Sequence, residues 1–545
     1  MTSQSSYAYM PLDGDGTGVD QGTTAMDDDL KAKQRYFGMT GTRLNAWVTV
    51  ACTAAMTLFG YDQGVFGGII VTEDFLKTMG NPDPQLQGTI VSLYDIGCFF
   101  GAIAAFLFGE HLGRKKSFIV GVIVMSIGAI LQTFSYTVTQ MIVARLITGL
   151  GNGVNTATAP VWQSETSKPA WRGKLVVFSM IMNIAGFSLS NWMTYGFSFL
   201  EGSISWRFPI AFQLAFSVIL LSTIPWLPES PRWLLAHGHL EEGVGVLVAL
   251  EGNGASPSSE VIVQQRDAIL NAARMDREVA VTWRDVIKGN TGNTGMIRRL
   301  CLGAGTQWMQ QLVGINVTSY YLPLVLQNSV GLSNNLSRLL AACNSVSYLI
   351  FSFFGLLLIE KAGRRKLMMW GAAGQCLCYI FITGLLSKAE DAGEPSSGTR
   401  YGAGATFFFF AYYLFFGICW QGVPWLYPTE INSLAMRTKG AGLATASNWI
   451  SNYIVVQVTP PGIAALGWRF YSIWAFFNAI FIPVVWLIYP ETANRHLEDI
   501  DTLYRENNTM FIVVRNKEAT QVERPQRFVD ADKELLESRM ELDGT

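Results

Sequence analysis

Twelve long apolar segments limit the fold of this 545-residue chain more than any other feature. They lie at 46–70, 87–108, 118–135, 140–161, 174–197, 208–227, 300–327, 338–359, 367–387, 404–427, 440–459 and 469–489. A helix of about 20 apolar residues spans the hydrocarbon core of a bilayer, where only helices and closed barrels satisfy every backbone hydrogen bond. Because half of the residues are hydrophobic and 15% are charged, we expect an all-α membrane protein with twelve transmembrane helices.

Short motifs from the first six segments recur in the second six. The pairs are GRKK at 113–116 and GRRK at 363–366, Glu165 with Arg172 and Glu430 with Arg437, WRF at 206–208 and 468–470, and Pro228-Glu229 and Pro490-Glu491. Such a repeat predicts two pseudo-symmetric six-helix bundles with a substrate site between them near the bilayer midplane. The expected domains are a disordered N-terminal tail (1–45), a first bundle (46–228), a linker with short helices (229–299), a second bundle (300–489) and a C-terminal tail (490–545).

Lysine and arginine gather in the loops on one side of the predicted bundles, for example at 111–116, 168–174, 361–366 and in the linker. By the positive-inside rule these loops face the cytosol, so we expect both termini there. The expected location is the plasma membrane. On the external side, Asn335 begins the sequence Asn-Leu-Ser and is a candidate for glycosylation.

Acidic residues accompany the basic loops at matching places in both halves. The set is Arg114, Glu165, Arg172 and Glu229 in the first half, and Glu360, Arg364, Glu430, Arg437 and Glu491 in the second. Membrane topology alone explains the basic residues but leaves the matched acids unexplained. We therefore favour salt-bridge networks that hold a cytosolic gate shut and break when the halves rotate.

The sequence QQLVGINVTSYYLP at 310–323 places two glutamines, an asparagine and paired tyrosines inside the seventh apolar segment. A buried amide without a partner costs about 1–3 kcal/mol, so these side chains are expected to face a polar cavity at membrane depth. Uncharged amides and phenols suit a ligand rich in hydroxyl groups, each of which both donates and accepts. The alternative is that they only tie neighbouring helices together.

Three ionisable residues, Asp62, Asp95 and Arg145, lie well inside the apolar segments of the first half. Their cost in hydrocarbon makes function or pairing the default explanation. If Arg145 holds the ionised Asp62, protonation of Asp62 releases it and permits a conformational step. A static structural ion pair is the alternative. Asp95 is a candidate second titrating group or a direct acceptor for a hydroxyl.

The chain resembles the sugar porter family of the major facilitator superfamily over roughly residues 45–505. The matching strings are GYDQG (60–64), HLGRKK (111–116), ARLITGLGNG (144–153), PVWQSE (160–165), PESPRWLL (228–235), QQLVGINVTSYYLP (310–323), EKAGRRK (360–366), VPWLYPTE (423–430), SNWISN (447–452) and LEDID (497–501). The resemblance implies sugar ligands at Gln310, Gln311, Asn316, Trp425 and Asn448, with Tyr320 and Tyr321 at the outer mouth as part of a gate. Asp62 with Arg145 resembles the coupling pair of bacterial sugar/proton symporters.

Several positions depart from the family pattern. Met180 stands where a hexose-binding glutamine is expected, and Asn183, about one turn on, is the candidate replacement. Gln421 adds an amide before the Pro-Trp pair of the tenth segment. Strings such as SLYDIGCFFGA at 92–102 are similar to the fungal branch that includes glycerol/proton symporters, which weakens a plain glucose assignment.

The expected function is a secondary transporter that imports a sugar or sugar alcohol by alternating access, together with protons. Its expected partners are that solute, protons and membrane lipid, and its expected state is a monomer. The alternatives are an uncoupled uniporter, a carrier of a non-sugar metabolite and a nutrient sensor that does not transport. The segments contain no constellation of nucleophile, base or metal ligands, so we expect neither an enzyme nor a cofactor or metal. A net charge of −2 gives no reason to expect nucleic acid.

Overall fold

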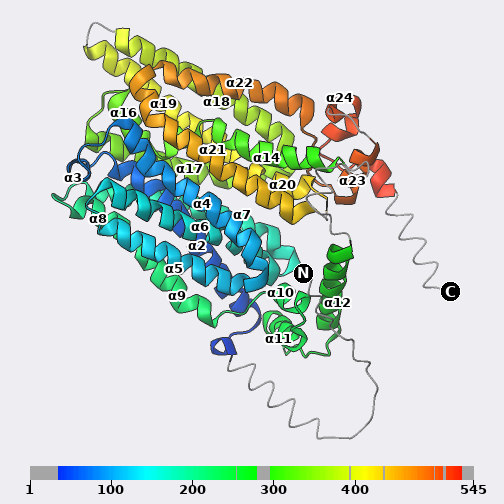
Figure 1. The fold of residues 1–545 in the computed structure, drawn as a ribbon. Helices are drawn as coiled ribbons and strands as arrows, with labels where there is room; N and C mark the ends of the chain where they lie inside the picture. Colours follow the sequence, from blue (N-terminus) through cyan, green and yellow to red (C-terminus); the bar gives the residue numbers. More distant parts are fainter. Residues whose placement is uncertain are drawn as a thin grey trace, which may run out of the picture.

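The computed structural model describes residues 35–530, except 253, 279–294, 392–394, 434–435, 496 and 507–510. The predicted disorder of the N-terminal tail therefore falls almost entirely outside the described residues. Within the described ranges every regular element is a helix, and most of the helices run side by side (Figure 1).

Eight described segments are long and apolar enough to cross a membrane. They are Thr42–Ile69 of α2 (Gly41–Ile69), α4 (Pro84–Leu112), α5 (Arg114–Thr133), Ile204–Trp226 covering α8 (Ile204–Ala211) and α9 (Gln213–Thr223), α17 (Asn334–Ala362), α18 (Arg364–Asp391), Gly398–Ile431 covering most of α19 (Pro395–Phe415) and α20 (Val423–Ile431), and α22 (Arg469–Ile488). Each corresponds to one predicted span.

The other four predicted spans are also helical. They correspond to α6 (Val138–Thr166), α7 (Pro169–Phe197), the run α14 (Met296–Leu312), α15 (Ile315–Ser319) and α16 (Leu322–Asn328), and α21 (Arg437–Leu466). Buried polar side chains lower the hydropathy of at least three of them: α6 carries Arg145, α14 carries Gln310, and α21 carries Asn448 and Asn452. Because these polar groups face protein and not lipid, their helices still fit within a membrane.

Besides the sixth span, which is divided into α8 and α9 at Phe212, two spans are broken helices. The seventh span breaks at Gly314, whose φ of +92° is a left-handed conformation that disfavours a side chain, and a Cβ there would lie 2.4 Å from the Tyr379 hydroxyl oxygen. The tenth passes through a π-helical turn, Phe416–Trp420, before α20. These breaks free backbone carbonyls to accept side-chain hydrogen bonds at membrane depth. Val313 O accepts one from Asn478 Nδ2 at 3.1 Å.

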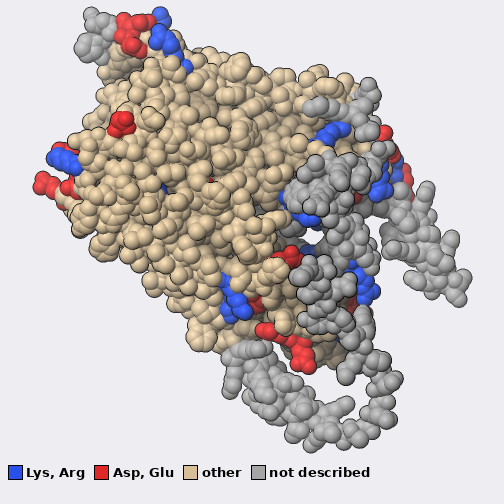
Figure 2. All heavy atoms as spheres, in the orientation of Figure 1, with Lys and Arg blue, Asp and Glu red and all other residues tan. Residues whose placement is uncertain are grey.

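The helices form two groups in chain order, with α2–α9 in one and α14–α22 in the other (Figure 1). Short helices of the linker and the C-terminal region gather at one end, here called the linker end: α10 (Pro231–Ala236), α11 (Leu240–Glu251), α12 (Glu260–Glu278), α23 (Leu497–Glu506) and α24 (Ile512–Arg515). At the opposite end lies α3 (Glu73–Thr78). Figure 2 shows charged side chains mainly near these two ends, with a broad uncharged surface between them.

The two groups touch chiefly through α4 against α21 and α7 against α17. Toward the opposite end, polar contacts join them directly. Asn334 Nδ2 donates to Val71 O at 3.0 Å, and Arg338 Nη2 donates to Thr72 Oγ1 at 3.0 Å. Gln457 Oε1 accepts from Ser92 Oγ at 2.6 Å. The opposite end is therefore closed in this conformation.

Candidate substrate and coupling site

A cluster of amide side chains connects α14 to α21. Gln307 and Gln310 share one face of α14 because residues three apart lie together on a helix. Asn448 Nδ2 on α21 donates to Gln307 Oε1 at 2.6 Å and to Gln310 Oε1 at 3.1 Å. Gln310 Nε2 donates in turn to Trp420 O at 2.9 Å, a carbonyl in the π-helical turn. All three amides are almost fully buried, so they are held in place by protein contacts.

A second set of amides comes from α14, from α15 beyond the break at Gly314, and from the next turn of α21. Asn316 Nδ2 donates to Gln311 Oε1 and, at 2.6 Å, to Asn452 Oδ1. The structure thus places Gln310 and Asn448 in one hydrogen-bonded set and Gln311 and Asn316 in another, and the two sets together are called the amide cluster. Every member has amide atoms that can either donate to or accept from a hydroxyl.

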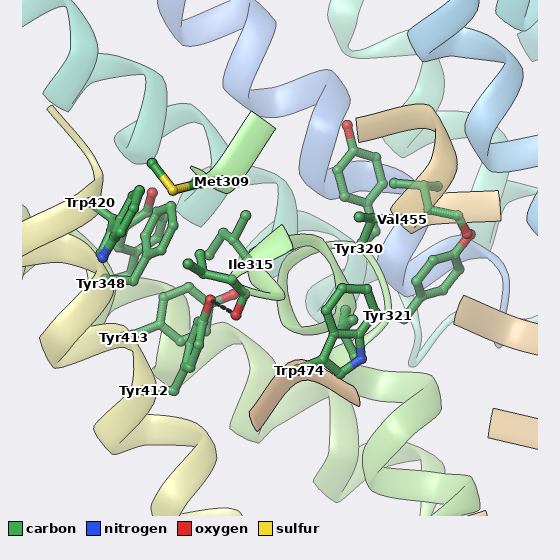
Figure 3. Packing of buried hydrophobic residues seen from close by; sticks show 14 of the residues in the cluster. Met309, Ile315, Tyr320, Tyr321, Tyr348, Tyr412, Tyr413, Trp420, Val455 and Trp474 are labelled. Carbon is green, nitrogen blue, oxygen red and sulfur yellow. Dashed lines mark hydrogen bonds between the residues drawn. The ribbon is translucent and has the colours of Figure 1, made fainter. Parts of the chain in front are cut away.

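Aromatic rings flank this cluster. Tyr348 Oη donates to Gln421 Oε1, and the Tyr348 and Tyr413 rings lie 4.8 Å apart. Figure 3 shows Tyr348, Tyr413 and Trp420 to one side of Ile315. Gln421 therefore already has a phenol partner in this conformation.

Two predicted ligands lie outside the hydrogen-bonded cluster. Trp425 is half-buried on α20. Asn183 is buried on α7, where its Nδ2 donates to Met56 O at 3.3 Å. Asn183 thus fastens α7 to α2 in this conformation, and its role as a replacement sugar ligand stays a prediction.

Tyr320 and Tyr321, which the resemblance places at the outer mouth as part of a gate, are buried in this structure. They are 1% and 0% exposed and lie in the closed contact between the helix groups. Tyr320 Oη donates to Asp95 Oδ1 at 3.4 Å, and Tyr321 Oη donates to Val456 O at 3.0 Å. The closure of the opposite end explains their burial.

Asp62 and Arg145 form a fully buried ion pair, with 3.5 Å between Arg145 Nη1 and Asp62 Oδ1. Arg145 also donates to Val91 O at 2.9 Å and lies 4.0 Å and 4.4 Å from the ring centroids of Phe66 and Tyr94. Asp62 Oδ2 is buried and has no hydrogen-bond partner among the described residues. A pair with one contact at this distance is loose for a purely structural bridge, which generally needs close and multiple hydrogen bonds to offset desolvation.

Asp95 lies between the two helix groups. Its Oδ1 accepts from Asn452 Nδ2 at 3.1 Å and from Tyr320 Oη at 3.4 Å, and both donors belong to the second half. Its Oδ2 is buried and has no hydrogen-bond partner within the described part of the chain. This carboxyl therefore reaches the amide cluster, which the sequence alone did not reveal.

The predicted gate residues form two matching networks at the linker end. Arg114 binds Glu165 through two contacts of 3.0 and 3.2 Å. In the second half, Arg364 binds Glu430 at 2.7 Å and Glu360 at 2.8 Å. Each described ion pair of these sets lies within one half, so in this conformation the networks fasten helices inside each half. The side chain of Arg172 lies outside the described residues, and Arg437 begins α21.

Glu229 and Glu491 occupy equivalent places in the two halves. Glu229 accepts from the backbone nitrogens of Arg114 and Lys115 at the start of α5, and Glu491 accepts from that of Arg364 at the start of α18. A carboxylate is favourable at a helix N-terminus. Burial raises the pKa of the Glu229 carboxyl from its ordinary value, against the opposing effect of the backbone hydrogen bonds.

Sequence reasoning missed two members of the amide cluster, Gln307 and Asn452. Both had a signal. Gln307 precedes Gln310 and Gln311 at helical spacing, and Asn452 follows Asn448 by one helical turn. A search for amides at intervals of three or four residues would have found them.

Residues 47–504 match the family model described as Sugar (and other) transporter. The chain is 52% identical over 513 residues to the MFS-type transporter oryC of Aspergillus oryzae, covering 93% of this chain and 94% of that one. It is 33% identical over 486 residues to Sugar transporter STL1 of Saccharomyces cerevisiae, covering 87% and 83%. A structure of the proton:xylose symporter XylE, a transporter from E. coli, matches with a TM-score of 0.68 and 24% identity, covering 84% and 99%.

Proposed function

Because the chain belongs to the sugar porter family of the major facilitator superfamily, we propose that it imports a sugar or sugar alcohol together with protons. It is a multi-pass membrane transporter and not an enzyme. The observation that carries the proposal is the buried amide cluster of Gln310, Gln311, Asn316 and Asn448, which is linked through Asn452 to Asp95 on α4.

The amide cluster supports a solute with several hydroxyl groups. Each amide offers one carbonyl and one amino group within a few ångströms of the next, for example across the 2.6 Å contact from Asn316 to Asn452. A polyol or sugar can exchange such contacts one for one, because every hydroxyl both donates and accepts. The amides themselves carry no charge, and the ionisable group that bonds to them is the Asp95 carboxyl.

The buried pair Asp62 and Arg145 supports proton coupling. A carboxyl that is 0% exposed and held by one long contact can exist charged only while its cation stays close. Protonation removes that requirement and lets α2 and α6 move apart. XylE, which has the same fold, is described as a proton:xylose symporter.

We further propose that the linker end faces the cytosol, with both termini there, and that the protein resides as a monomer in the plasma membrane. The division into two bundles (46–228 and 300–489), a linker and two tails belongs to the same proposal. Asn335, which is exposed at the start of α17, then faces outward and is accessible for glycosylation. In this orientation the gate networks of Arg114 and Arg364 lie at the cytosolic side.

A second candidate is transport of a non-sugar metabolite. It is favoured by Met180 at a position where the family binds hexose through glutamine, and by the bond that already joins Tyr348 to Gln421. Both features reduce the number of side-chain amides that are available to bind a sugar. An uncoupled uniporter remains a third candidate, since it needs the same site without the proton step.

Uptake of labelled glycerol, glucose, xylose and cellobiose into transporter-deficient yeast tests the proposal. We expect accumulation of one of these solutes that a protonophore abolishes. Gln310→Leu is expected to lower its uptake by about tenfold, because one hydrogen bond to the solute is lost and its partners are left unpaired. Gln264→Leu, which changes an exposed glutamine on α12, is the matched control and should leave uptake unchanged. Absence of uptake of all four solutes despite surface expression would contradict the proposal.

A further inference from the structure

We propose that the protonation state of Asp95 sets the direction of the hydrogen bonds in a relay of three amides, Asn452, Asn316 and Gln311, and thereby the affinity of the site for a hydroxyl-bearing solute. This inference rests on the proposed function, since the last two amides belong to the proposed solute site. Through this relay, protonation affects the solute site independently of the pair of Asp62 and Arg145.

The relay is continuous and buried. Asn452 Nδ2 donates to Asp95 Oδ1 at 3.1 Å, and Asn316 Nδ2 donates to Asn452 Oδ1 at 2.6 Å and to Gln311 Oε1. The four side chains are between 0% and 6% exposed. The described residues provide no hydrogen-bond partner for Asn316 Oδ1 or Gln311 Nε2. A solute hydroxyl therefore meets one acceptor and one donor at this end of the relay.

Asp95 determines this pattern because an ionised carboxylate can only accept. Asn452 must then turn its amino group toward Asp95, which leaves its carbonyl oxygen facing Asn316. Asn316 must then donate to that oxygen through its amino group, and its own carbonyl oxygen stays available to the solute. Each orientation follows from the one before it, starting at the carboxylate.

A protonated Asp95 allows the reverse arrangement. The carboxyl then donates to the carbonyl oxygen of Asn452, whose amino group turns toward Asn316. Asn316 accepts that bond through its carbonyl oxygen, which is no longer available to the solute. Tyr320 does not prevent the change, because its hydroxyl can rotate to donate or to accept.

Other titratable groups surround Asp95, and their effects on solute affinity must be distinguished from that of Asp95. Arg145 on α6, Asp62 on α2, and Tyr320 and Tyr321 beside α15 interact with it electrostatically, as does Cys98 on α4 itself. The relay exists only where the second half touches α4, because Asp95 is its one member from the first half. The effect therefore belongs to the conformation that is closed at the opposite end.

Solute affinity as a function of pH tests the relay. The protein is reconstituted in liposomes with the same pH on both sides, and affinity for glycerol, glucose and xylose is measured by counterflow between pH 5 and 8. In the wild type we expect the affinity for the transported solute to change by about tenfold, the effect of one mismatched buried hydrogen bond. Asn452→Leu, which is similar in volume but cannot relay, is expected to bind more weakly with no more than a twofold change across the range.

Three further variants complete the test. Asp95→Asn should also lose the pH dependence, and Asn452→Ala serves if the leucine variant does not fold. Ser92 lies on α4, as Asp95 does, and Ser92→Ala removes its bond to Gln457 on α21. This variant should keep the wild-type pH dependence of solute affinity. A full pH dependence in the Asn452 variants, or none in the wild type, would overturn the inference. A wild type that exchanges none of the solutes at any pH would overturn the proposed function instead.

Discussion

Gly88→Trp is expected to hold the opposite end of the transporter open and to abolish net uptake while the protein still reaches the membrane. Gly88 is buried on α4, and a Cβ there would lie 2.7 Å from the backbone carbonyl oxygen of Gln457 on α21. A backbone atom cannot rotate away as a side chain can. Even a few added carbons cost about 1–3 kcal/mol in a packed contact, which is roughly a 5- to 140-fold shift between two conformations. The indole of tryptophan adds many more atoms, so its cost in free energy is larger.

The measurement is initial uptake per molecule at the cell surface, together with labelling of Thr72→Cys by a membrane-impermeant maleimide. Thr72 is 7% exposed in the closed contact, so labelling should accelerate when this end stays open. Gly196→Trp is the matched control, because a Cβ at Gly196 on α7 meets nothing within 4 Å. Wild-type uptake by Gly88→Trp would show that closure of this end is not part of the transport cycle.

Asp62→Asn is expected to abolish accumulation against a gradient while counterflow continues. Asparagine fits the same space and can still accept a hydrogen bond from Arg145, but it cannot take up or release a proton. Removing one partner of a buried ion pair costs about 3–5 kcal/mol. Arg145 keeps its bond to Val91 O and its contacts with the rings of Phe66 and Tyr94, which lower that cost.

Counterflow serves as the folding control for this variant, because exchange of solute requires an intact site. Asp83→Asn is the matched substitution, since Asp83 is an exposed carboxyl that caps α4 and asparagine caps a helix equally well. The ratio of internal to external solute should fall from above one to about one in Asp62→Asn alone. Retained accumulation would assign the proton step to another group.

The sequence predicted the helical segments well, because hydropathy over about 20 residues follows directly from bilayer thickness. It did not predict the breaks at Gly314 and at Tyr320–Tyr321, which divide one apolar span into three helices. Glycine alone is a weak signal in a chain with 53 of them. What makes Gly314 a break is the Tyr379 hydroxyl beside it, and that contact joins residues 65 positions apart.

The candidate site was predictable in its residue types and less so in its connections. Gln310, Gln311 and Asn316 stood out as polar groups in an apolar run, and the structure joins them to α21. That Asp95 bonds to Asn452 across the two halves depends on how those halves meet in one conformation. No local pattern encodes such a contact. For the same reason, the burial of Tyr320 belongs to the closed state and not to its sequence position.

The central claim is that this chain moves a hydroxyl-bearing solute together with protons. The most direct measurement uses purified protein in liposomes loaded with a pH-sensitive dye, with the solute selected by the uptake panel added outside at equal pH. We predict that solute addition acidifies the interior, and that Asp62→Asn removes this signal while solute exchange persists. Uptake of the solute without acidification in the wild type would contradict proton coupling and identify a uniporter.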